Sequence, residues 1–178
     1  MVTRILVTAL SLLLAIAGGG LAANAAPLAA SPTMYVAETT SGGQPLFHFS
    51  GQRPDNLGVK DGKLMACPGS PNCVSSQAPS TDAEHSIAPL SYDSSPAEAI
   101  ARLKSIVEGM ERTEIIKETD NYLYAEFTSK LMGFVDDVEF YAEPDTGTVH
   151  VRSASRLGQS DLGVNRQRIE AIRQQWTA

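Results

Sequence analysis

The chain has 178 residues, with 14 lysines and arginines against 20 aspartates and glutamates, and a formal net charge of −6. This length corresponds to one domain of ordinary size. The acidic balance argues against nucleic acid and anionic membrane surfaces as partners, although it leaves room for a local basic patch.

The first 25 residues have the pattern of a secretory signal peptide. Arg4 precedes an apolar stretch over residues 5–17, and small residues follow up to Ala25. The apolar stretch is about 13 residues long, shorter than the roughly 20 that cross a bilayer as a helix. We predict cleavage after Ala25, which leaves 178 − 25 = 153 residues, a net charge of 13 − 20 = −7 and no membrane span. The alternative is an uncleaved N-terminal anchor.

Residues 26–52 are predicted to form a flexible leader. They are rich in alanine, proline, serine, threonine and glycine and show no apolar period. A short ordered patch around residues 46–49, Leu-Phe-His-Phe, is compatible with this pattern. Over residues 53–79, turn sequences such as Asp61-Gly62 predict an extended belt that lies on a domain.

The belt contains the two cysteines of the chain, Cys67 and Cys73. An even number of cysteines in an exported protein favours a disulfide, and the Pro-Gly-Ser-Pro-Asn spacer favours a tight turn between them. Closing so short a loop contributes about 2 kcal/mol in the entropy model. A switchable redox pair and metal ligation are the alternatives. The pair lacks C-x-x-C spacing and the three histidines are scattered, so we predict no metal and no cofactor.

A strand is expected over residues 85–92, with Ile87 and Leu90 in the core. After it, Ser95-Pro96-Ala97-Glu98 forms a capping box with proline at the first helical position. Apolar residues then recur at helical spacing, which predicts a helix over residues 96–110.

The helix is followed by a first hairpin with strands over residues 113–119 and 122–129. Asp120-Asn121 is a plausible tight turn between them. Neither obvious register keeps every apolar side chain on one face, so the pairing stays open.

A second hairpin has strands over residues 134–142 and 148–155. The register that pairs Glu143 with Thr148 places opposite charges across from each other, which supports it. In this register Asp136 faces Ser155.

A second helix is predicted over residues 164–176, with Arg168 mostly off its buried face. That face is marked by three apolar residues, Ile169, Ile172 and Trp176. The predicted fold is a single α+β domain over residues 53–178. It consists of an antiparallel sheet packed by two helices, with an N-terminal extended segment held by a short disulfide loop.

Three separated segments carry a resemblance. They are CPGSPNCVSS at residues 67–76, FVDDVEF at 134–140 and VRSASRLGQSDLGVNR at 151–166. In this order they resemble domain of unknown function family 1499, over roughly residues 56–176. The sequence RPDNLGV at residues 53–59 further resembles cyanobacterial and plastid members, which implies the periplasm or the thylakoid lumen as destination. The family has no established activity, so the resemblance implies no catalytic residues.

Two adjacent aspartates, Asp136 and Asp137, stand in the middle of a predicted strand and point to opposite faces. On one face, Asp137 and Glu139 are expected to form a solvated charge ladder with Arg152 and Arg156.

Asp136 shares the other face with apolar side chains, where a carboxylate is costly unless hydrogen bonds compensate for it. One interpretation is structural: Asp136 accepts hydrogen bonds from Ser153, Ser155 or loop amides and holds the loop that leads to Asn165. The other is functional: Asp136 is a general base or a ligand acceptor.

The region Arg152–Arg166 combines two glycines, several hydroxyls and arginines at the start of a helix, a composition that suits a carboxylate, phosphate or sulfate. Asp161 is also a candidate for the helix cap. The predicted ligand-binding residues are Asp136, Arg152, Ser153, Ser155, Arg156, Asp161, Asn165 and Arg166.

These features predict an exported soluble protein that is a non-enzymatic binding or assembly module. Its site is the polar region Arg152–Arg166, and its partner is a protein or a small anionic ligand. One alternative is a hydrolase that uses Asp136 with Ser155 or His85, although no nucleophile-elbow sequence is present. A second alternative is a carrier of a small apolar ligand, held between sheet and helix.

Overall fold

The computed structural model describes residues 45–177. The predicted signal peptide and the leader before residue 45 lie outside the described residues. Within residues 45–177, none of the helices has the length and apolar character needed to cross a membrane.

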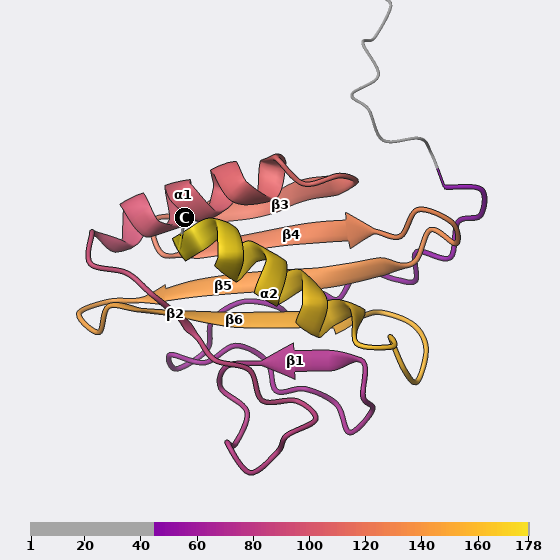
Figure 1. Cartoon of the computed structure of the whole chain (residues 1–178), viewed down its shortest axis with the longest axis horizontal. Helices are drawn as coiled ribbons and strands as arrows, with labels where there is room; N and C mark the ends of the chain where they lie inside the picture. The colour runs from indigo at the N-terminus through magenta and orange to yellow at the C-terminus, as the bar shows by residue number, and fades with distance from the viewer. Residues whose placement is uncertain (1–44, 178) are drawn as a thin grey trace, which may run out of the picture. The chain divides into compact units, whose positions relative to one another are not determined.

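An antiparallel sheet forms the centre of the domain (Figure 1). Its spatial order is β1 (Cys73–Ser75), β6 (Thr148–Ser155), β5 (Val135–Glu143), β4 (Tyr122–Thr128) and β3 (Thr113–Thr119), and the two-residue β2 (Leu90–Ser91) also pairs with β6. The strand predicted over residues 85–92 is therefore mostly irregular, although Ile87 and Leu90 are buried as expected. The three residues of β1 are too few to show a period of two in the sequence.

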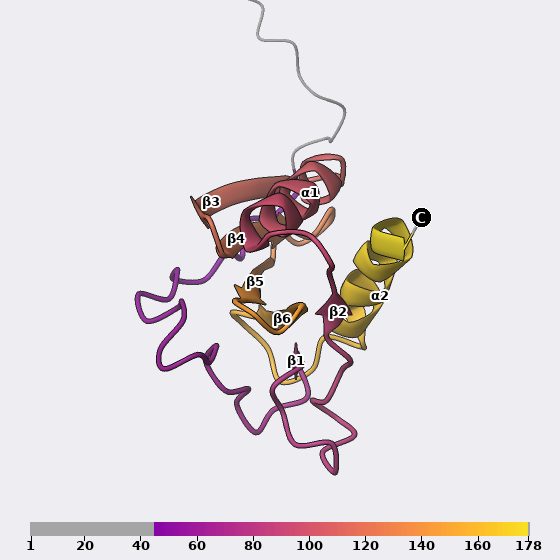
Figure 2. The ribbon, with the colours of Figure 1, turned by 90° about the vertical axis from the view of Figure 1, so that its left-hand side faces the viewer.

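Two helices, α1 (Pro96–Glu108) and α2 (Val164–Thr177), cover one face of the sheet (Figure 2). The predicted capping box is confirmed: the Ser95 hydroxyl accepts from the Glu98 amide, and the Glu98 carboxylate accepts from the Ser95 amide. Apolar side chains of both helices and of the sheet fill the space between them. The largest of these are fully buried: Phe140, Leu90, Ile100, Leu103, Leu123, Ile169 and Ile172. The predicted α+β fold is confirmed.

The two hairpins differ in regularity. The second pairs Glu143 with Thr148 and Asp136 with Ser155, so its predicted register is confirmed. The first shifts register between Ile115 and Lys117. A bulge of this kind places an extra residue in one strand, which explains why no single register satisfies the apolar pattern.

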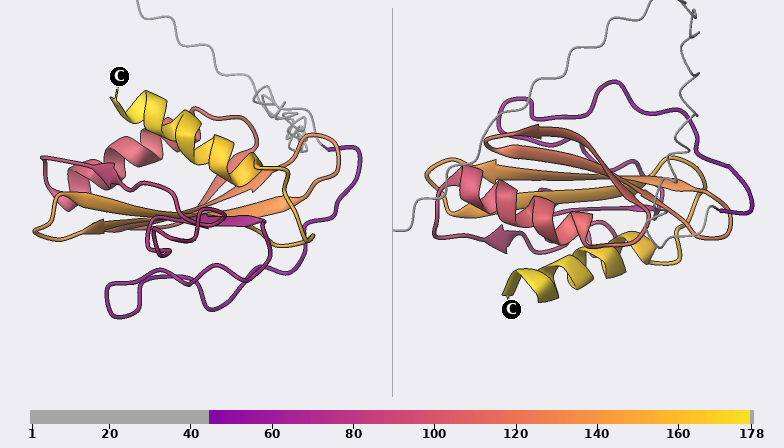
Figure 3. Two further views of the ribbon diagram at one scale, coloured as in Figure 1. Left: turned by 60° about the horizontal axis from the view of Figure 1, so that its bottom comes forward. Right: turned by 90° about the horizontal axis from the view of Figure 1, so that it is seen from above.

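The belt, residues 53–79, contributes β1 to the sheet, and its part before β1 crosses the face opposite the helices as a third layer (Figures 2 and 3). Its apolar residues pack on three tyrosines of the sheet; the contacts join Leu57, Val59 and Leu64 to Tyr122, Tyr124 and Tyr141. The predicted disulfide between Cys67 and Cys73 is present.

An arm formed by residues 45–52 runs into the belt and lies along the loop between β4 and β5. The Phe47 amide donates to the Leu131 carbonyl, and the Phe49 amide to the Met132 carbonyl. Gly133 has a φ of 66°, and a Cβ there would lie 2.2 Å from the Phe47 carbonyl oxygen. Only glycine therefore permits this close approach of the two backbones.

We expect Gly133→Ala to release the arm and to lower stability more than Gly62→Ala does. Both positions have a positive φ, at a cost of about 1–2 kcal/mol for alanine. A Cβ at Gly62 meets nothing within 4 Å, so only Gly133→Ala adds a clash with Phe47. Urea unfolding, combined with limited proteolysis of residues 45–52, measures both effects. Equal losses in the two variants, with an intact arm, would contradict the expectation.

Candidate functional site

The predicted site residues separate onto the two faces of the sheet, because neighbouring strand residues point in opposite directions. Asp136, Ser153 and Ser155 face the helices. Arg152 and Arg156 face the belt together with Asp137. The site residues therefore form two clusters, one on the helix side of the sheet and one on the belt side.

Arg156 is the centre of the belt-side cluster. Its Nε donates to both carboxylate oxygens of Asp137 at 3.1 and 3.0 Å, and its Nη2 donates to the Tyr124 hydroxyl at 3.1 Å. The same Nη2 contacts Oε1 of Glu126, and Nε of Arg53, a half-exposed side chain of the belt, contacts the same oxygen. Two carboxylates and two guanidinium groups therefore neutralise each other.

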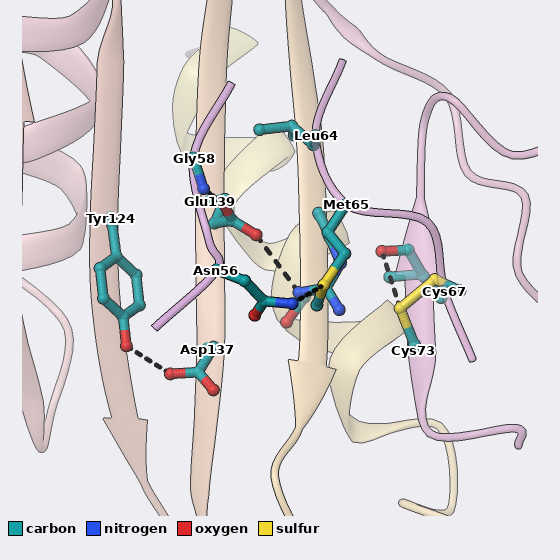
Figure 4. A network of polar contacts seen from close by, with 12 residues as sticks. Asn56, Gly58, Leu64, Met65, Cys67, Cys73, Tyr124, Asp137 and Glu139 are labelled. Atoms are coloured by element: carbon teal, nitrogen blue, oxygen red, sulfur yellow. Dashed lines mark hydrogen bonds and ion pairs between the residues drawn. A yellow bond between two sulfur atoms is a disulfide. The ribbon is translucent and has the colours of Figure 1, made fainter. Parts of the chain in front are cut away.

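Glu139 occupies the neighbouring position on the same face and is fully buried. Its carboxylate accepts from Arg152 Nη1 at 3.2 Å, from the Tyr122 hydroxyl at 2.8 Å and from the Gly58 amide at 2.9 Å. Figure 4 shows Gly58 of the belt beside Glu139, and Tyr124 and Asp137 facing each other nearby. Within the described residues, Nε of Arg152 is buried without a hydrogen-bond partner.

The prediction that the charge ladder on this face is solvated is wrong. The predicted partners are correct, but the Arg152 and Glu139 side chains are 3% and 0% exposed, and those of Arg156 and Asp137 are 5% and 3% exposed. The belt covers the ladder, which the alternation of residues within the strands does not reveal. The pairs consequently lie in a medium where losing one partner is costly.

The belt-side contacts also shift the ionisation of these groups. Burial by itself raises the pKa of Glu126, but the hydrogen bonds from Arg53 and Arg156 outweigh it and leave the pKa below its usual value. Burial by itself lowers the pKa of Arg156, and hydrogen bonds to Asp137 and Glu126 reverse the direction. Burial and the bond to Asp137 raise the pKa of Tyr124. Glu126 and Arg156 therefore stay charged, and the Tyr124 hydroxyl stays protonated, near neutral pH.

The helix-side cluster joins Asp136 to α2. Arg168 Nη2 donates to the Asp136 carboxylate at 2.5 Å, and Arg168 Nη1 donates to Ser153 and to Asn165. We expected Ser153, Ser155 or loop amides to donate to Asp136. The structure corrects this expectation, because the group that compensates the Asp136 carboxylate is the Arg168 guanidinium. This side chain lies toward the sheet, whereas the sequence placed it mostly off the buried face.

Asn165 is fully buried and connects this cluster to the disulfide loop. Its Nδ2 donates to the Asn72 carbonyl and to the Ser155 hydroxyl, both at 3.0 Å. Its Oδ1 accepts from the Ser153 hydroxyl at 2.6 Å. The amide of this one side chain therefore joins α2, β6 and the residue before Cys73.

The remaining two candidates, Asp161 and Arg166, form hydrogen bonds to backbone groups and not to each other. The Asp161 carboxylate accepts from the amides of Gly163 and Asn165, so it serves as the cap of α2. Burial by itself raises the pKa of Asp161, but these amide bonds lower it overall. Arg166 donates to the carbonyls of Ser86, Ala83 and Glu84. Each arginine and the helix start of the predicted anion site thus has partners within the chain.

The residues of the hydrolase alternative are not brought together. Asp136 binds Arg168, and the Ser155 hydroxyl accepts from Asn165. His85 is buried elsewhere, with Nδ1 2.8 Å from Asp82 and Nε2 3.2 Å from the Ser70 carbonyl. A pocket of about 370 Å³ adjoins His85 and Cys67. The described residues contain no group of three or more His, Cys, Asp or Glu side chains suited to hold a metal ion.

A patch of exposed apolar side chains lies at the end of the sheet where the arm enters. We call it the end patch. Phe49 packs between Phe47 and Phe134, with ring centroids 6.3 and 5.8 Å away. The arm also approaches Leu157: a Cβ added to Gly51 would lie 3.1 Å from Leu157 Cγ. The end patch consists of Leu46, Phe47, Phe49, Leu131, Phe134 and Leu157, which are between 39% and 75% exposed.

Several residues of these clusters escaped the sequence analysis. Arg168 follows Asn165 by three positions and therefore shares its helix face, a signal that was available. Tyr124 and Glu126 alternate with the apolar Ala125 and Phe127, which indicates a common face. Arg53 and Asn72 stand in irregular segments, where no period predicts what a side chain contacts.

The fold and the two clusters define a class of domain: an antiparallel sheet with helices on one face and, on the other, an extended belt over buried ion pairs. The family described as Protein of unknown function (DUF1499) matches residues 63–176, and the chain belongs to this family. The match begins inside the belt, so Arg53 and Gly58 precede it. No curated protein and no solved structure shows significant similarity to the chain.

We expect Asp137→Ala to lower the free energy of unfolding by about 3–5 kcal/mol, because it leaves the Arg156 guanidinium buried without its main partner. Asp120→Ala, in the exposed turn between β3 and β4, is the control and should change stability little. Urea unfolding of both variants tests this. A small loss for Asp137→Ala would contradict a buried ion pair.

A second expectation concerns pH. Both ring nitrogens of His85 face acceptors, a carboxylate and a carbonyl, so the geometry favours the protonated imidazole, which donates to both. The bond to Asp82, then that to Ser70, raises the pKa of His85, while the same bond lowers the pKa of Asp82.

The contribution of His85 is therefore complete below its unfolded pKa of about 6.5 and is lost as pH rises through the higher folded pKa. We expect the Tm difference between wild type and His85→Gln to shrink from pH 5.5 to pH 9. In an Asp82→Asn background this pH dependence should largely disappear. A difference that grows with pH would overturn the assignment.

Proposed function

We propose that the protein is an exported, non-enzymatic binding module that docks a partner protein on the end patch. The end patch includes Leu157, which lies in the predicted Arg152–Arg166 region. The contact proposed here is apolar, whereas the sequence analysis predicted an ionic one. The signal-like N-terminus and the disulfide support export to the periplasm or the thylakoid lumen.

The observation that carries the proposal is a contrast at one end of the sheet. The charged side chains there are engaged inside the molecule: Arg156 by Asp137, Arg168 by Asp136, and Arg166 by backbone carbonyls. The apolar side chains there are instead exposed, and the rings of Phe47, Phe49 and Phe134 pack in a row. A small anionic ligand has to displace an internal partner to reach these arginines, whereas an apolar partner surface does not.

The charge around the end patch indicates the kind of partner. Segments 45–53, 129–134 and 156–164 contain three basic residues, Arg53, Lys130 and Arg156, and one acidic residue, Asp161. Arg53 and Arg156 are neutralised by Glu126 and Asp137, so Lys130 and Asp161 remain and the local balance is 1 − 1 = 0 in a chain of net charge −6. An apolar surface with a neutral rim is therefore the best match.

Partner capture tests the proposal. The tagged full chain is expressed in its native host as wild type and as Phe134→Ser/Leu157→Ser. Both side chains are well exposed, so the double variant should stay folded, which its Tm verifies. We expect one protein to be recovered with wild type and to be reduced at least about tenfold with the variant, as hot-spot truncation predicts. Binding of that purified protein is then measured by calorimetry.

Asp120→Ser, at the opposite end of the sheet, is the matched surface control and should retain the partner. Equal capture by wild type and the end-patch variant would overturn the proposal. So would capture by lipid vesicles or by a second copy of the chain alone, because either would replace the partner protein as the occupant of the patch.

A further inference from the structure

We propose that the Cys67–Cys73 disulfide controls the shape of the end patch through Asn72. This regulatory role rests on the function proposed above, because it concerns the same surface. The disulfide closes a loop whose last residue before Cys73 is Asn72, and Asn72 is the residue that fastens the segment between β6 and α2.

Asn72 makes three hydrogen bonds to that region. Its Nδ2 donates to the Gly158 carbonyl at 2.8 Å, and its own carbonyl accepts from the Ser155 amide and from Asn165 Nδ2, both at 3.0 Å. The side chain is buried. Gly158 directly follows Leu157 of the end patch, so Asn72 sets where Leu157 lies relative to the arm.

The disulfide loop in turn holds Asn72. The Ser70 hydroxyl donates to Asn72 Oδ1 at 2.8 Å, and the Asn72 amide donates to the Ser70 carbonyl at 2.8 Å. The same carbonyl accepts from His85. Residues 68–72 therefore form a small closed unit, tied at one end by the disulfide and fixed on the domain by Asn72 and by His85.

Opening the unit is a two-electron reduction. A thiolate of a dithiol reductant attacks Sγ of Cys67, which is the more exposed cysteine, and Cys73 leaves as a thiolate that takes up a proton. The second thiol of the reductant then releases Cys67 as a thiol, and the reductant becomes a disulfide. Two electrons and two protons pass to the protein, and the Cys67–Cys73 bond is lost.

The reduced loop gains conformational freedom at the end nearest Cys67. The loop-closure entropy of so short a ring corresponds to a factor of roughly 30 in the local opening equilibrium. This change acts on Asn72 and the segment that it fastens. Reduction therefore loosens Leu157 from the arm and divides the end patch.

Amide hydrogen exchange on the full chain, oxidised or reduced with dithiothreitol, tests the proposal. The Ser155 amide reports on the bond to Asn72, and amides of α1 such as Leu103 report on global stability. We expect exchange at Ser155 to rise roughly 30-fold on reduction and to depend little on low urea concentrations, as a local opening does. Exchange at Leu103 also rises, because reduction removes the same closure entropy from global unfolding, but it keeps the steep urea dependence of global unfolding. Unchanged exchange at Ser155, or a urea dependence at Ser155 as steep as that at Leu103, would overturn local control by the disulfide.

Two variants keep the test decisive. The pair Cys67→Ser/Cys73→Ser should reproduce the reduced state without a reductant. In oxidised Asn72→Ala the side-chain bond to the Gly158 carbonyl is absent, while the backbone carbonyl that accepts from the Ser155 amide remains. Partner affinity should therefore fall in this variant with little change in exchange at Ser155. Unchanged partner affinity in oxidised Asn72→Ala would show that the Asn72 side chain does not carry the coupling to Leu157.

Partner binding separates this inference from the proposed function. If both hold, reduction lowers the affinity of the captured protein at least about tenfold in wild type. If the exchange result holds but Phe134→Ser/Leu157→Ser captures the partner normally, the end patch is not the docking surface. If patch variants lose the partner but reduction changes neither exchange nor affinity, the disulfide has no regulatory role.

Discussion

The burial of Asp137 and Glu139 on the belt side of β5 is the constraint on which the other contacts of that face depend. A carboxylate removed from water is tolerated only with cations or several hydrogen-bond donors close by. The sheet provides Arg152 from β6 and tyrosine hydroxyls from β4, and Arg156 directly follows β6. The belt provides the Gly58 amide and the apolar cover that excludes water. Belt and sheet therefore depend on each other. Without the belt, the carboxylates of the sheet lose a hydrogen-bond donor and their apolar cover, and without the sheet, the apolar side chains of the belt have nothing to pack on.

The same constraint separates the two faces of the sheet by chemistry. Toward the helices, the sheet is apolar except at the end near the start of α2, where Asp136 is paired with Arg168 and Asn165 satisfies two serines. Toward the belt, it is mostly aromatic and ionic. Both polar clusters end at the same edge of the domain, where the arm, the β4–β5 loop and the loop after β6 meet.

This arrangement changes what the C-terminal motif means. A cluster of serines, arginines and an asparagine before a helix suggests ligand recognition when it is read as a list of side chains. In the folded chain the arginines neutralise buried carboxylates or hold backbone carbonyls, and Asn165 joins α2 to the disulfide loop. These polar residues therefore build the scaffold, and the exposed side chains around them are phenylalanines and leucines.

The sequence by itself determined the elements whose evidence is local. The capping box at Ser95, the register of the second hairpin and the disulfide each depend on residues close together in the chain, where helix geometry, strand alternation and turn chemistry act directly. The bulge in β3, the burial of the charge ladder and the partner of Asp136 were decided only by the tertiary structure. Each depends on residues distant in the chain, such as Arg53 with Glu126 or Arg168 with Asp136, and no periodic pattern encodes which irregular segment will cover a strand.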